Sequence, residues 1–405
     1  MQAKGESMAG TLHRADSIDS SGFPLGFKVR QGLVRPGVLG GKASKDLFRV
    51  ELRAMGGHQK EAVVSEGATG SVFRAVSDEG PALMGTDLAP MPLGFMNAGM
   101  MSDLQNRFMQ LAAARAIRVD ACMMELHNAY LFVGSFFRGD GHGSAQAPRF
   151  RLKITSPAPA GELHVLALAA LDASPLVAMC RSPLENTFAF YVNGTRRPLV
   201  TLPPSSAPDA ADPLKIWKNV PAPLAGANDL PDMVAKLATI TPSAAPPVDP
   251  AATQRRAINV YGVSRWLDGV TESEVIGSGS RFGLKSDERP DTDKAPSGLA
   301  LAAMGVAFCL STQFLRYAEH HKMNLRALRI VQDSPFETTG NAAQGTLRAR
   351  AYPMDTHIFL HGEESDERME KLLIMAQNTC YLHALLHDPL APQIELEVNG
   401  VAVAA

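Results

Sequence analysis

The feature that most constrains the fold of this chain is an internal repeat. Glu162–Gly194 and Arg368–Gly400 align without a gap at an offset of 206 residues, with nine identities that include the closing Val-Asn-Gly. The same offset relates Asp87 to Asp293 and Phe108 to Phe314 further upstream. A register kept over so long a distance predicts two copies of one supersecondary unit, which pack against each other to complete a core.

The repeat also sets the expected boundaries. Residues 203–254 are rich in Pro, Ala, Ser and Asp, a composition that cannot build a packed core, so we expect a linker with at most one short helix within residues 229–240. Residues 1–21 are polar and predict a disordered tail. The two arms are then residues 22–202 and 255–405.

Each arm repeats the same order of elements. Strand-like segments come first, then a long apolar helix, further strands, a second helix and a closing strand, so the predicted class is α+β. The central helices are predicted at Leu93–Ala116 and Gly298–Lys322. The second helix of the C-terminal arm is predicted at Ser365–Leu386, with Ser365 as its N-cap. Both central helices are apolar enough to be buried, so we expect them to face each other.

Composition excludes several classes of partner. Lys and Arg number 39 against 41 Asp and Glu, a net charge of −2, which provides no electrostatic reason to bind nucleic acid or an anionic membrane. No apolar run reaches the 18 residues of a membrane span. Four cysteines are too few for a disulfide scaffold, which favours a reducing compartment such as the cytoplasm.

Two segments of the C-terminal arm resemble a known family. Ser286–Glu288 followed by Leu299–Cys309 (LALAAMGVAFC), together with Asn378–Leu390 (NTCYLHALLHDPL), are similar to the two cysteine helices of the OsmC family, which includes the organic hydroperoxide resistance proteins. The resemblance covers about residues 256–400 well and 23–200 more loosely. It implies two OsmC-like repeats, each an antiparallel sheet with a buried central helix, that form a pseudo-dimer within one chain.

The resemblance implies thiol chemistry in the stress response. Cys309 would be the peroxidatic residue and Cys380 the resolving one, acting on a small hydroperoxide with a thiol as reductant and no metal or cofactor. At the offset of 206 residues, Asp103 and Ser174 stand where the second arm has these cysteines, so the first arm has lost both thiols. The remaining cysteines, Cys122 and Cys180, are predicted to be structural.

One departure concerns how the thiolate is activated. Family members with hydroperoxide activity carry a Glu about ten residues before the cysteine, paired with an Arg, but this position is Leu299 here. Glu288 is too far upstream by simple spacing. The strand-rich segments offer several arginines, among which the sequence does not choose: Arg30, Arg35, Arg265 and Arg281.

Three other possibilities remain open from the residues. Cys380, His383 and His387 share a helix face, which could ligate zinc, or His383 could serve as base or acid for a cysteine. A cysteine-dependent hydrolase would need a His beside its nucleophile. A non-catalytic binding or structural relative would keep its cysteines buried and unreactive. The sequence leaves further oligomerisation of the chain open.

Overall fold

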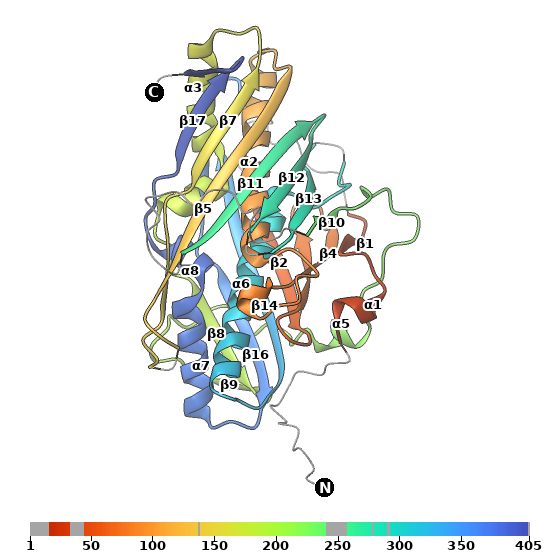
Figure 1. Cartoon of the computed structure of the whole chain (residues 1–405), viewed down its shortest axis with the longest axis vertical. Helices are drawn as coiled ribbons and strands as arrows, with labels where there is room; N and C mark the ends of the chain where they lie inside the picture. The colour runs from red at the N-terminus through yellow and green to blue at the C-terminus, as the bar shows by residue number, and fades with distance from the viewer. Residues whose placement is uncertain are drawn as a thin grey trace.

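The computed structural model describes residues 16–32, 44–136, 138–239, 257–277, 279–289 and 292–403, and in these ranges the chain is α+β, as predicted (Figure 1). The helices are α1 (Ile18–Ser21), the 3-10 turn η1 (Pro81–Leu83), α2 (Pro92–Ala114), α3 (Ala160–Ala173), α4 (Pro175–Arg181), α5 (Leu214–Lys218), α6 (Gly298–His320), α7 (Asp366–Thr379) and α8 (Tyr381–His387). The strands are β1 (Gly26–Arg30), β2 (Ser44–Ala54), β3 (Lys60–Glu66), β4 (Val72–Ser77), β5 (Ala121–Val133), β6 (His142–Ala145), β7 (Arg149–Thr155), β8 (Thr187–Val192), β9 (Thr195–Arg197), β10 (Val234–Ala238), β11 (Ala257–Leu267), β12 (Val270–Ile276), β13 (Arg281–Asp287), β14 (Leu325–Thr339), β15 (Arg348–Ala351), β16 (Asp355–Gly362), β17 (Gln393–Val398) and β18 (Val401–Val403).

These strands form two sheets, and each sheet takes strands from both arms. Sheet A has the order β1-β4-β3-β2-β14-β16-β8-β9, with β15 beside β14, and sheet B has the order β10-β13-β12-β11-β5-β7-β17-β18, with β6 beside β5. Most neighbours are antiparallel, but β16 runs parallel to β8 and β17 runs parallel to β7. The boundaries 22–202 and 255–405 therefore mark repeats along the chain, and not units that close separately.

The central helices α2 and α6 cross between the two sheets. Small residues allow a close approach, because a Cβ built on Gly99 would stand 2.6 Å from the carbonyl oxygen of Gly298. The rings of Phe95 and Phe308 meet across the same contact, with their centroids 5.1 Å apart. The buried apolar residues of both arms join in one continuous core around these helices.

By length and composition alone, helix α6 could cross a membrane. The bent pair of α3 and α4 meets the same criterion if the two helices are counted as one span. The most apolar 18 residues of α6 are entirely buried inside the protein. This helix therefore has the character of a core helix, whose apolar surface is covered by the sheets and by its neighbours.

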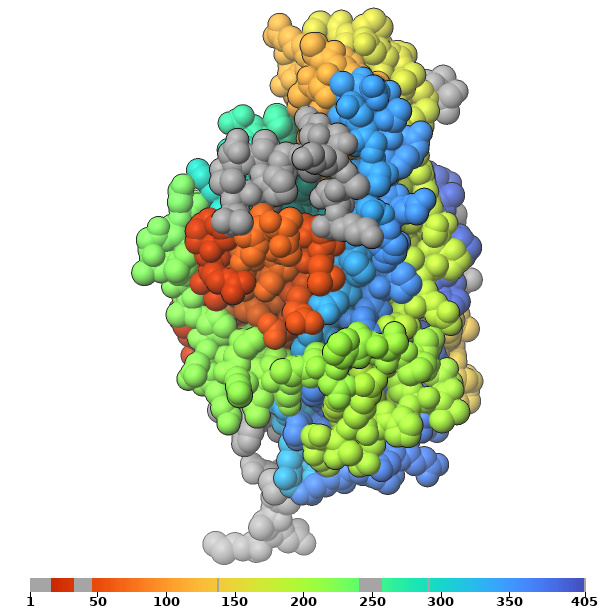
Figure 2. Space-filling model, turned by 180° about the vertical axis from the view of Figure 1, so that it is seen from behind, coloured from red at the N-terminus to blue at the C-terminus, as the bar shows by residue number. Residues whose placement is uncertain are grey.

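Two segments expected to lack structure are partly folded onto the core. Within the predicted linker, Trp217 of α5 is buried against Val63 and Val72. Val234–Ala238, in the segment that was expected to hold at most one short helix, forms strand β10 and pairs with β13. Figure 2 shows residues 203–239, in green, lying across the N-terminal strands. In the predicted tail, Ile18 is buried in α1. Residues 1–15 and 240–256 lie outside the described residues.

Candidate active site

Cys309 lies in the middle of α6 and is 2% exposed. The helix begins after Ser297, whose hydroxyl accepts a hydrogen bond from the Ala300 amide at 3.3 Å. From there α6 runs through the core with apolar residues on every face. The fold therefore places this thiol away from bulk solvent.

Cys380 lies at a break between two helices, and not inside one long helix as predicted. Its backbone is extended (φ −75°, ψ 113°), so α7 ends there and α8 begins at Tyr381. The side chain is fully buried, and its thiol lies near enough to Cys309 for the two thiols to influence each other electrostatically. Burial first, and then the neighbouring Cys309, raise the pKa of the Cys380 thiol well above its ordinary value. Both cysteines are free.

His383 lies one turn into α8 and contacts Cys380. Its Nδ1 is 3.2 Å from the Cys380 sulfur. The ring is tilted against that of Phe188, with the two centroids 5.8 Å apart. The residue is 2% exposed, and burial lowers its pKa from 6.5 to about 4, so the imidazole is neutral at pH 7. Its Nε2 has no hydrogen-bond partner. The predicted acid or base thus lies beside Cys380.

The first arm shows the same arrangement with different chemistry. Ser174 occupies the break between α3 and α4, and its hydroxyl donates a hydrogen bond of 2.6 Å to Asp103 Oδ2 on α2. The amide of Leu176 binds the same oxygen at 3.2 Å, and Arg107 Nε donates to Asp103 Oδ1 at 3.1 Å. A carboxylate and a hydroxyl therefore make the helix-to-helix contact that two thiols make in the second arm.

A cation and an acid approach the Cys309 helix from the other arm, which the sequence did not reveal. Thr312, one turn after Cys309, donates to Glu79 Oε1 at 2.6 Å and accepts from Lys60 Nζ at 2.7 Å. Lys60 and Glu79 form a buried ion pair at 3.3 Å. The sequence Ser-Asp-Glu occurs at both Ser77–Glu79 and Ser286–Glu288, and this repetition was the available signal for the acid.

The equivalent acid of the second arm, Glu288, lies near the central helix of the first arm. Glu288 Oε1 accepts from the Gly298 amide at the start of α6, and its other oxygen is 4.0 Å from Arg107. Glu79 of the first arm therefore contacts α6, the central helix of the second arm. Glu288 of the second arm binds the start of α6 and also lies near Arg107 on α2, the central helix of the first arm.

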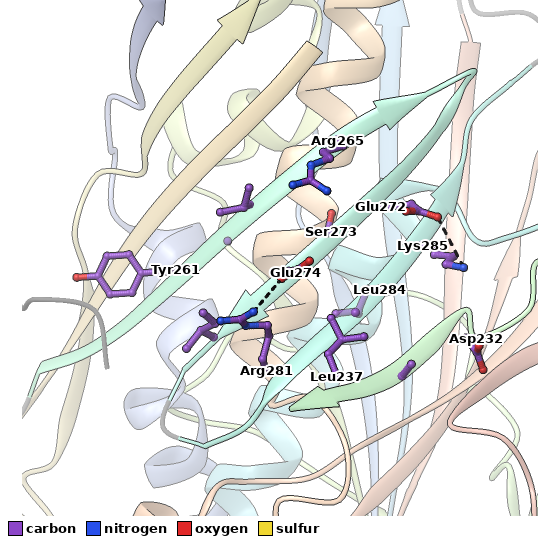
Figure 3. A pocket seen from close by; sticks show the side chains of 15 residues that line it. Asp232, Leu237, Tyr261, Arg265, Glu272, Ser273, Glu274, Arg281, Leu284 and Lys285 are labelled. Atoms are coloured by element: carbon purple, nitrogen blue, oxygen red, sulfur yellow. Dashed lines mark ion pairs between the residues drawn. The ribbon is translucent and has the colours of Figure 1, made fainter. Parts of the chain in front are cut away.

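The arginines proposed from the sequence lie elsewhere. Arg30 donates to the Gly70 carbonyl at the surface. Figure 3 shows Arg265 and Arg281 in a pocket of about 450 Å³ on the outer face of sheet B, where Arg281 pairs with Glu274 at 3.6 Å. This pocket holds no cysteine or histidine among its described lining residues, so we do not assign it to the thiol site. Arg35 lies outside the described residues.

The remaining cysteines are buried, and burial raises the pKa of both Cys122 and Cys180 to about 12. Cys122 accepts a weak hydrogen bond from Gln105 at 3.8 Å. Tyr130 of β5 lies near Cys180 as well as near the Cys309–Cys380 pair, and burial followed by these thiols raises its pKa well above the ordinary value. Thiols with such a pKa are unreactive at neutral pH.

The zinc hypothesis does not fit the geometry. His387 is exposed and its Nδ1 pairs with Asp388 at 3.2 Å, away from Cys380. Over the ranges that the structure describes, no three His, Cys, Asp or Glu side chains are grouped to hold a metal ion.

Comparison with known proteins finds a similarity to one family. Residues 291–395 match the family model for OsmC-like protein. A crystal structure of an OsmC-like hydroperoxide resistance protein from Jannaschia sp. CCS1 matches at 21% identity, over 36% of this chain and 96% of that one, with a TM-score of 0.26. No curated protein matches. The chain is therefore OsmC-like over residues 291–395, the region that holds both Cys309 and Cys380.

Proposed function

We propose that this chain is a cysteine-based redox protein of the cytoplasm, a thiol peroxidase that reduces small or organic hydroperoxides. Cys309 is the peroxidatic residue and Cys380 the resolving one. The observation that carries the proposal is the contact between these two buried free thiols, one on the central helix and one at the α7–α8 break of the OsmC-like region. The substrate class comes from the resemblance of these helices to hydroperoxide resistance proteins.

The reaction balances in three steps. The Cys309 thiolate attacks the terminal oxygen of the hydroperoxide, the O–O bond breaks, and the alkoxide leaves as an alcohol after taking a proton. The Cys380 sulfur then attacks the Cys309 sulfenic acid, a disulfide forms, and the hydroxyl leaves as water with the thiol proton. Two equivalents of an external thiol reduce the disulfide and are themselves oxidised to a disulfide.

Lys60 supplies the positive charge for the first step in this proposal. It reaches Thr312, one turn from Cys309, and Glu79 holds it there. Its ammonium group is thus held in a buried site beside the helix that carries Cys309. The Lys60–Glu79 pair thereby takes the place of the Arg–Glu pair that the position of Leu299 lacks.

The test is hydroperoxide consumption at steady state with dithiothreitol as reductant. Cys309→Ser should fall to the uncatalysed rate, because no other described thiol contacts Cys380 in place of Cys309. Cys380→Ser should oxidise once and then turn over poorly. The matched control is Cys122→Ser, which removes a buried thiol in contact with Gln105 and should keep the wild-type rate. Wild-type turnover by Cys309→Ser would refute the proposal.

A hydrolase is the second candidate, because His383 lies 3.2 Å from the Cys380 sulfur in the manner of a nucleophile and its base. In that case hydrolysis of an activated thioester would survive Cys309→Ser and be lost in Cys380→Ser.

A further inference from the structure

A second pocket, of about 330 Å³, opens at the helix break that holds Cys380. One wall comes from the end of α7 and the start of α8, with Gln377, Asn378, His383 and Ala384 on either side of the cysteine. The facing wall includes Phe188 of β8 and the exposed Thr201 beyond β9. Residues of the first arm therefore face the α7–α8 break of the second across this cavity.

His383 joins this pocket to the cysteine. Its Nδ1 contacts Cys380, whereas Nε2, on the opposite side of the same ring, has no hydrogen-bond partner although the residue is 2% exposed. A buried polar atom without a partner costs about 1–3 kcal/mol. An occupant of the pocket that supplies a polar partner would recover that loss.

The pocket lies nearer to one of the two sulfurs. Neither cysteine is among its lining residues, but His383 lines it and contacts the Cys380 sulfur, whereas Cys309 lies on α6. A molecule in the pocket is therefore separated from Cys380 by the His383 ring.

We propose that this pocket admits the thiol that reduces the Cys309–Cys380 disulfide, and that His383 positions its sulfur through Nε2. The inference rests on the proposed function and names the route of its reductant. The thiolate attacks Cys380, the Cys309 thiolate leaves, and a mixed disulfide forms on Cys380. A second thiol then attacks the outer sulfur, releasing the oxidised reductant, and Cys380 regains its proton.

The charge of the lining defines the class of thiol. Glu185 and Asp388 are carboxylates in the lining, where Asp388 lies 3.2 Å from His387, and His142 also lines the pocket. No Lys or Arg is present among the residues that the structure places around the pocket. The neutral His383 adds no positive charge. An uncharged or cationic small thiol therefore fits this site better than an anionic one.

The experiment measures access to Cys380 without depending on peroxidase turnover. In a Cys309→Ser background, reduced protein is labelled with aminoethyl or sulfonatoethyl methanethiosulfonate, and the rate at Cys380 is followed by peptide mass. The cationic reagent should react about threefold faster or more than the anionic one. Thr201→Trp at the rim should slow the cationic reagent about tenfold, since thiol exchange depends on access. The control Thr195→Trp, on the exposed strand β9, should leave the rate unchanged.

The second measurement separates the half-reactions of the Cys309-containing protein. Thr201→Trp should slow disulfide reduction by cysteamine about tenfold and leave oxidation by hydroperoxide unchanged. His383→Asn, which keeps an atom near Cys380 but loses Nε2, should also slow only reduction. Equal labelling in both tryptophan variants would overturn the route. Slowed oxidation in place of slowed reduction would instead make the pocket the hydroperoxide entrance. Failure of wild type to form the disulfide would refute the proposed function, whatever the labelling shows.

Discussion

Gly99 is the residue whose substitution tests the helix crossing most severely. A Cβ at this position would lie 2.6 Å from the Gly298 carbonyl oxygen and 2.9 Å from the Ala302 amide nitrogen, where ordinary contact begins at 3.4 Å. Both neighbours are backbone atoms, so no side chain can rotate away and the helices must separate. Overpacking of this kind costs about 1–3 kcal/mol, while Ala in place of a helical Gly recovers about 1 kcal/mol. Gly99→Ala should therefore lose up to about 2 kcal/mol of unfolding free energy.

The assay is equilibrium urea unfolding followed by far-UV circular dichroism. The matched control is Gly161→Ala in α3, where an added Cβ meets no atom within 4 Å. Because the helix-propensity gain is unopposed there, the control should be as stable as wild type or more stable by up to about 1 kcal/mol. A Gly99→Ala variant as stable as the Gly161→Ala variant would refute the close crossing of α2 and α6.

Three further predictions follow from buried polar groups. Lys60→Met should cost about 3–5 kcal/mol, because it leaves Glu79 buried without its cation, whereas Lys236→Met, which breaks a partly exposed pair with Asp87, should cost about 1 kcal/mol or less in the same urea assay. The pKa of His383 falls from 6.5 to about 4 on folding, so the unfolded chain binds its proton first and up to about 3 kcal/mol of stability is lost as the pH falls from 6.5 to 4. His383→Asn should therefore be less acid-sensitive than wild type, and equal pH profiles would contradict the buried neutral imidazole. Asp103→Cys with Ser174→Cys should create a second oxidisable pair, so that peroxide removes four titratable thiols in place of two; a loss of only two would contradict the equivalence of the two sites.

The repeat in the sequence predicted much of the fold. Both central helices lie within a few residues of their expected bounds, because a long apolar run with helical periodicity has few alternative structures. The exchange of strands between the arms was not predictable. An alternating pattern fixes which face of a strand is buried, but it does not name the partner at the sheet's centre, here β14 beside β2 and β11 beside β5.

The site was predicted in part for related reasons. Cys309 and Cys380 stood out because the family motif marks them, and His383 follows Cys380 by one helical turn. The Lys60–Glu79 pair was not predicted, because these residues of the first arm contact the Cys309 helix of the second arm only in the folded structure. Strand β10 was taken for a helix because a short apolar segment has no decisive periodicity, and its pairing with β13 decided the structure.

The most direct test of the account is peptide mapping under non-reducing conditions after one equivalent of an organic hydroperoxide, with free thiols blocked by alkylation. The account predicts one disulfide-linked peptide pair, joining Cys309 to Cys380, with Cys122 and Cys180 alkylated. Full alkylation of both Cys309 and Cys380, or a disulfide that includes Cys122 or Cys180 in their place, would contradict it.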